Sequence, residues 1–179
     1  SVLLAPVATT AQSGTLIWNT FQGGVDAVYG QAIAVDDQGY SYLAGYANDS
    51  WGSPVLDFSS APDGVVVCLD PDGGLVWHTF VGGDGGDEIN GITVNNSGFI
   101  YVAGTSTQGW GSPVRSYQHM DDGFVACLDS SGNLLWNTFL GGDSMDDARA
   151  VAVDDAGYIY AAGDGYSNWG SDPVRSFTD

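Results

Sequence analysis

Short apolar runs alternate with polar turns along almost the whole chain, in a pattern that repeats. Each period holds four runs, which we expect to be strands. The first run is short and nearly all apolar, the second carries aromatic residues, and both faces of the fourth are partly apolar. In that order the expected strands are 32–35, 92–94 and 151–153; 40–46, 99–105 and 158–163; 65–69 and 124–128; and 75–80 and 134–139, with an earlier fourth strand at 16–21.

The segments between these runs have the composition of tight turns. Asp or Asn opens each turn and Gly closes it, where a left-handed backbone suits glycine. First and second strands are joined at 36–39, 95–98 and 154–157, and third and fourth strands at 70–73 and 129–132. The pattern therefore predicts antiparallel hairpins in an all-β chain.

The period of the repeat is 59 residues. Trp18, Trp77 and Trp136 are spaced by that number, and so are the three Trp-Gly-Ser markers that begin at Trp51, Trp110 and Trp169. A four-stranded sheet repeated at this interval is typical of a β-propeller blade. We expect one repeat domain over 1–179, about three blades' worth. Its parts are an N-terminal half-blade (1–22), repeat 1 (23–81), repeat 2 (82–140) and a partial repeat 3 (141–179).

Several phrases of the sequence resemble the SBBP repeat, a bacterial-type β-propeller repeat. They are residues 110–115, 122–129, 133–142 and 151–160, and the resemblance extends over about residues 14 to 179. It implies secreted or cell-surface proteins, often large and adhesin-like, without enzymatic activity or catalytic residues. Cys68 and Cys127 stand where the family usually has a basic residue, so a family-wide interaction through that charge is not expected here.

The charge of the chain is strongly negative. It has 22 acidic residues against three arginines (Arg115, Arg149 and Arg175) and no lysine, with a formal net charge of −19. Like charges repel, so nucleic acid and anionic lipid are not expected partners. No stretch is apolar and long enough to span a bilayer. The run from Val2 to Ala8 resembles the end of a signal peptide, and equally it fits a first strand.

The two cysteines occupy equivalent positions of successive repeats. Equivalent points on neighbouring blades usually diverge, so a disulfide between Cys68 and Cys127 is not expected. We interpret both as small buried hydrophobic residues.

Acidic residues cluster in the glycine-rich loops that follow the fourth strands. One loop holds Asp84, Asp87 and Glu88, and the next holds Asp143, Asp146 and Asp147. Clustered carboxylates suit Ca²⁺, which takes six to eight oxygen ligands. The competing interpretation is that these aspartates bind backbone amides of turns. The first repeat keeps only Asp26 of this pattern.

Tryptophans mark two kinds of position. Trp51, Trp110 and Trp169 lie in long loops between second and third strands, where exposed aromatics beside Asp and Asn would suit a glycan. Repetition at equivalent positions equally fits packing between blades. Trp18, Trp77 and Trp136 lie within expected strands and are predicted to be core.

Catalytic patterns are absent from the sequence. His78 and His119 are isolated from any metal or triad spacing, and His78 replaces an Asn at its repeat position, as a tolerated variant would. No phosphate loop or nucleophile elbow is found. The chain is therefore expected not to be an enzyme.

The phase of the repeats suggests an incomplete ring. If residues 2–9 act as a third strand, the N-terminus is half a blade and the C-terminus is the complementary half. We expect a non-enzymatic extracellular structural protein that assembles with itself head-to-tail into a filament or ring. The alternatives are a piece of a longer many-bladed chain, and a lectin-like or protein-binding module of a larger surface adhesin.

Overall fold

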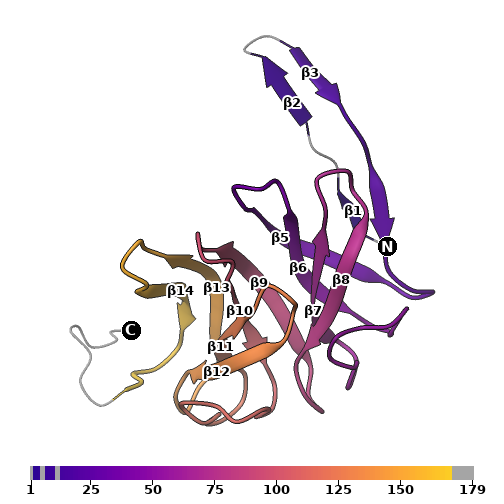
Figure 1. Ribbon diagram of the computed structural model, residues 1–179. Helices are drawn as coiled ribbons and strands as arrows, with labels where there is room; N and C mark the ends of the chain where they lie inside the picture. Colours follow the sequence, from indigo (N-terminus) through magenta and orange to yellow (C-terminus); the bar gives the residue numbers. More distant parts are fainter. Residues whose placement is uncertain (1, 5–6, 11–12, 171–179) are drawn as a thin grey trace.

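The computed structural model describes residues 2–4, 7–10 and 13–170, and it contains strands and no helix in that part of the chain (Figure 1). No described segment is therefore a helix able to cross a membrane. The strands are β1 (Val2–Leu4), β2 (Val7–Thr10), β3 (Ser13–Leu16), β4 (Thr20–Gln22), β5 (Val28–Val35), β6 (Ser41–Ala47), β7 (Asp63–Leu69), β8 (Leu75–Val81), β9 (Asp87–Val94), β10 (Ile100–Ser106), β11 (Asp122–Leu128), β12 (Leu134–Leu140), β13 (Asp146–Val153) and β14 (Ile159–Gly165).

Two four-stranded antiparallel sheets form the centre of the molecule. The first blade has the order β5-β6-β7-β8 and the second has the order β9-β10-β11-β12. In the described part of the chain a further sheet consists of β13 and β14 alone, and we call it the open blade. These sheets confirm the predicted all-β fold of four-stranded antiparallel units, in which every connection within a blade joins neighbouring strands.

The hairpin turns use aspartate and asparagine as the sequence predicted. Asp36 Oδ1 accepts hydrogen bonds from the backbone N–H groups of Gln38 and Tyr40, both at 2.9 Å. Asp70, Asn95, Asp129 and Asp154 bind backbone amides two and four residues ahead in the same way. These four aspartates are therefore accounted for by local backbone geometry.

A glycine that recurs in the second strand allows a bulge in the first. The register of β9 and β10 shifts between Ala103 and Gly104. A Cβ at Gly104 would lie 2.1 Å from the carbonyl oxygen of Glu88, and the equivalent Gly45 and Gly163 are as close to their own first strands. Only glycine permits this approach, which increases the local twist of the blade.

The core lies between the blades as well as within them. The largest buried cluster includes Val66 of β7, Ile89 of β9 and Phe139 of β12, so it joins both complete sheets. The first strands meet along the same line, since β9 packs against both β5 and β13. Cys68 and Cys127 are buried and unpaired, which confirms their expected role as small hydrophobic residues.

The fourth-strand tryptophans Trp18, Trp77 and Trp136 pack against the buried clusters as predicted, and they lie at the edge of the core. Trp18 and Trp77 are half-buried. Trp18 Nε1 donates to the carbonyl of Pro71 at 2.9 Å, and Trp77 Nε1 donates to that of Ser130 at 3.0 Å. Each indole thus reaches the turn between third and fourth strands of the next blade. The turn of the next blade thereby provides a hydrogen-bond partner for the indole N–H.

The N-terminal segment is less regular than predicted. The expected third strand over 2–9 is divided, because β1 pairs with β4 whereas β2 pairs with β3 in a separate hairpin. Figure 1 shows this hairpin extending away from the blades. The expected fourth strand at 16–21 is divided as well, and only Thr20–Gln22 pairs with β1. In a complete blade the third strand has partners on both sides, whereas among the described strands β1 has β4 alone.

We predict that Gly104→Ala lowers the free energy of unfolding by about 2–4 kcal/mol, because the new Cβ would collide with the backbone of β9. Urea denaturation followed by circular dichroism measures this loss. Ser97→Ala, at an exposed turn position, is the control and should change stability by less than about 0.5 kcal/mol. Equal effects of the two substitutions would contradict the role given to the bulge.

Candidate functional site

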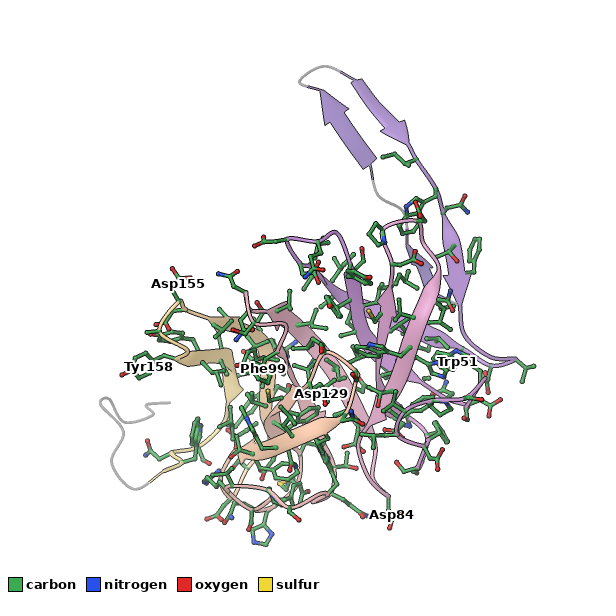
Figure 2. The ribbon with its side chains drawn as sticks, in the orientation of Figure 1. Trp51, Asp84, Phe99, Asp129, Asp155 and Tyr158 are labelled. Carbon is green, nitrogen blue, oxygen red and sulfur yellow. The ribbon has the colours of Figure 1, made fainter. Side chains whose placement is uncertain are left out.

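The carboxylates of the acidic loops do not lie close together. Asp84 is exposed at a loop tip that points away from the sheets (Figure 2), and Asp143 is exposed as well. Asp87 and Asp146 are buried at the starts of β9 and β13. Glu88 and Asp147 follow them in the strands and therefore lie on the opposite face. Among the described residues, no group of three or more acids, histidines or cysteines could hold a metal ion.

The opposite face of β9 and β13 lines a polar pocket of about 350 Å³. Arg149 lies there, with a guanidinium nitrogen 3.3 Å from Asp147 Oδ2 and a hydrogen bond to Asp164. Thr105 Oγ1 donates to Asp147 Oδ1 at 2.9 Å. Burial and the charge of Asp147 raise the pKa of Glu88. The carboxylate of Asp147 is thus already bound by the guanidinium of Arg149 and the hydroxyl of Thr105.

Asp87 and Asp146 instead belong to two buried aspartate pairs at the joints between blades. Asp63 and Asp87 both face Gly82, where a Cβ would lie 2.4 Å from Asp63 Oδ1 and 2.5 Å from Asp87 Oδ2. Asp122 and Asp146 converge on Gly141 in the same way, at 2.3 and 3.1 Å. All four carboxylates are at most 2% exposed. Each pair joins the third strand of one blade to the first strand of the next.

One oxygen of each of the four carboxylates accepts a hydrogen bond from the backbone N–H of a neighbouring loop. Asp63 Oδ2 accepts from the backbone N–H and the hydroxyl of Ser59, both at 2.7 Å, and Asp87 Oδ2 accepts from the N–H of Gly83 at 2.9 Å. Asp63 Oδ1 and Asp122 Oδ1 are buried without a hydrogen-bond partner among the described residues. These two oxygens are also the ones that lie beside Gly82 and Gly141.

The electrostatics of the two pairs differ. Burial and the neighbouring Asp87 raise the pKa of Asp63 to about 6, although the Ser59 hydrogen bonds oppose the shift. Burial also raises the pKa of Asp122, but there Arg115 opposes the shift. Leu56 occupies the position of Arg115 in the first blade, so the Asp63 pair has no such cation.

Sequence reasoning missed Asp63 and Asp122 as members of these pairs. The 59-residue spacing of the two residues at the starts of the third strands was the available signal. Val28 stands where Asp87 and Asp146 stand in the later repeats, so the joint before the first blade has no such acid on its first strand.

The loop tryptophans of the complete blades are used in packing. Trp51 stacks on His78 with ring centroids 4.6 Å apart, and it meets Phe80 edge-on. Trp110 meets Phe124 and Phe139 edge-on, at 5.2 and 5.8 Å. These contacts are those of the packing interpretation, and they leave little of either ring for a glycan.

His78 performs the task of the asparagine that it replaces. Its Nε2 lies 2.8 Å from the carbonyl oxygen of Trp51, and Asn137 Nδ2 donates to the carbonyl of Trp110 at 3.0 Å. Burial lowers the pKa of His78, which favours the neutral ring. The substitution is tolerated because both side chains place a nitrogen at the same point.

The open blade presents the remaining candidate surface. β14 pairs only with β13 in the described part of the chain, so its outer edge has no strand beside it. Tyr160 on this strand is 57% exposed, whereas the equivalent Tyr101 and Tyr42 are 7% and 4% exposed. Trp169 is 42% exposed, and the Arg115 guanidinium lies 5.6 Å from the centroid of its ring.

A segment at the N-terminal end of the array matches a known family of repeats. Residues 17–50 match the SBBP family, the beta-propeller repeat. The matched range starts just before β4 and ends after β6, and the SBBP resemblance of the sequence is thereby confirmed for this segment. The same pattern recurs 59 residues later, at 76–109, and again at 135–168. No curated protein matches the chain.

We predict that Asp63→Asn stabilises the protein at pH 8 and not at pH 4. The pKa of Asp63 is about 6 in the fold against an ordinary 3.8, so the folded state holds a proton that the unfolded chain releases. The resulting stabilisation is complete below pH 3.8 and is lost as the pH rises through 6. We expect a gain of about 1–3 kcal/mol at pH 8, measured by urea denaturation across this range.

Asp72→Asn is the matched control, because it removes the same charge from an exposed turn. If both substitutions changed stability equally at every pH, the effect would come from net charge and the Asp63 pair would have no special role.

Proposed function

We propose that this chain is a non-enzymatic structural module of β-propeller repeats that assembles head-to-tail, copy to copy, into a ring or filament outside the cell. The observation that carries the proposal is the contrast between buried side chains in the complete blades and exposed equivalents at the two ends of the array. Sheets of this kind bury their faces only against neighbouring sheets, so each end of the array needs a neighbour.

The N-terminal end of the array exposes apolar side chains. Phe21 is 61% exposed, although its equivalents Phe80 and Phe139 are at most 2% exposed. Ile33 of β5 is exposed too, whereas the equivalent Ile92 of β9 is buried against its neighbours. A second copy would cover Phe21 by completing the blade to which β4 belongs, and it would cover Ile33 by placing that blade before β5.

The C-terminal end exposes a complementary surface. β13 and β14 correspond to the first two strands of a blade, and the N-terminal residues up to Gln22 correspond by repeat position to the last two. The open blade of one copy and the N-terminal strands of the next would together make one blade. Such a head-to-tail contact closes into a ring or continues as a filament. Two copies would supply about six blades, within the usual range for closed propellers.

The negative charge of the chain restricts the surfaces through which two copies can associate. A net charge of −19 with no lysine keeps copies apart over most of their surface, so contact is favoured only where apolar surface offsets repulsion. The resemblance to SBBP repeats adds the expectation of a secreted or surface-exposed protein. We include extracellular or cell-surface localisation in the proposal on these grounds.

The test is the particle size of the purified chain, by light scattering and negative-stain imaging over a range of concentrations. We expect rings or fibres, and we expect removal of residues 1–9 to leave monomers because β1 is lost. Raising the salt concentration should promote assembly by screening repulsion between copies.

Two results would count against this function. One is a chain that stays monomeric at all concentrations and salt levels, which would point to a longer protein whose own further repeats complete the blade. The other is assembly that survives removal of residues 1–9 unchanged, which would place the contact elsewhere.

A further inference from the structure

Each loop tryptophan of a complete blade is held from two sides. On the inner side, Trp110 packs against Gly83, where a Cβ would lie 2.6 Å from the tryptophan Cβ, and Trp51 packs against Gly24. On the outer side, each is held by the fourth strand of its own blade. That strand supplies an edge-on phenylalanine (Phe80 or Phe139) and a side-chain nitrogen placed at the tryptophan carbonyl (His78 or Asn137).

Trp169 makes the same contact with a glycine that Trp51 and Trp110 make on their inner sides. A Cβ at Gly142 would lie 3.1 Å from the Cβ of Trp169, as Gly83 and Gly24 lie beside Trp110 and Trp51. A recess of about 130 Å³ lies beside the ring, lined by residues of β13 and β14. The Cβ of Trp169 is thus placed as in a complete blade, and the described part of the chain provides no fourth strand to cover the ring.

The residues that correspond to the missing fourth strand lie at the other end of the array. Phe21 is one repeat before Phe80, and Asn19 is one repeat before His78 and two before Asn137. Both side chains are exposed, in contrast to every one of these equivalents. The donor side chain and the phenylalanine are therefore present, in the right spacing, on a surface that β14 and Trp169 do not reach within one copy.

We infer that Trp169 of one copy packs edge-on against Phe21 of a second copy, whose Asn19 amide donates a hydrogen bond to the Trp169 carbonyl. This contact rests on the proposed head-to-tail function and names the residues that join the copies. The occupant is a second copy because its segment 19–21 carries the same asparagine and phenylalanine, in the same order, as the strand that covers Trp110. An aromatic pair buried at the centre of a joint is typical of residues that dominate binding.

The test uses two variants of the full chain, Phe21→Ala and Trp169→Ala, each of which removes one half of the joint. Either variant alone should assemble at least about 30-fold more weakly than the unmodified chain. An equimolar mixture should form a dimer and stop there, because only the Trp169 of one variant and the Phe21 of the other make an intact joint. Analytical ultracentrifugation resolves these species. Circular dichroism and urea denaturation of each variant, compared with the unmodified chain, establish independently that the variant is folded.

Controls come from exposed residues whose equivalents stay exposed in complete blades. Val25→Ala serves at the N-terminal end, and Ala156→Ser, in the β13–β14 turn, serves at the C-terminal end. Both should assemble like the unmodified chain.

The outcomes separate this inference from the function on which it rests. If the unmodified chain assembles and both alanine variants assemble equally well, the Trp169 contact is wrong and head-to-tail assembly stands. If the unmodified chain stays monomeric, the proposed function itself fails. A mixture that gives only monomers, beside an unmodified chain that assembles, also overturns the pairing of Trp169 with Phe21.

Discussion

Packing between successive blades is the interaction on which the rest of this structure depends. A blade of four strands has two apolar faces and cannot bury either one alone. The cluster that includes Val66, Ile89 and Phe139 shows the solution, because it belongs to two blades at once. Small residues in the first strand and a bulge opposite Gly104 let the sheets approach near the centre. The exposed ends of the array follow from the same constraint, since a terminal sheet has one face without a neighbour.

The joints between blades are more polar than the sheets that they connect. Two buried aspartates meet at Gly82, and two more meet at Gly141. Burying a carboxylate is costly unless it is hydrogen-bonded, and the backbone N–H groups of the loops offset part of this cost. The aspartates thereby hold the loops to the strand ends. The two carboxylates of a pair repel each other when both are ionised. At the second joint the positive charge of Arg115 offsets part of this repulsion.

The tryptophans illustrate how one repeat can serve packing and assembly with the same residues. Trp77 binds the turn of the next blade, and Trp110 is covered by the outer strand of its own blade. Neither contact is confined to one strand, so neither is complete at the end of the array. A repeat architecture turns a structural contact into a binding surface wherever the series is interrupted, which is the physical basis of the assembly that we propose.

The sequence by itself determined the fold class, the repeat length, the turns and the burial of Cys68 and Cys127. These are local properties, because alternation, turn residues and a 59-residue period act within one hairpin or recur visibly along the chain. The tertiary structure decided the rest. Asp63 and Asp87 lie in different blades, and no spacing indicates that their carboxylates meet at Gly82. The sequence grouped Asp84, Asp87 and Glu88 as neighbours, but alternation along β9 sends Asp87 and Glu88 to opposite faces, while Asp84 stays in the loop. The sequence also did not indicate that the N-terminal segment divides into β1 and β2, because this division depends on which strands lie beside β1.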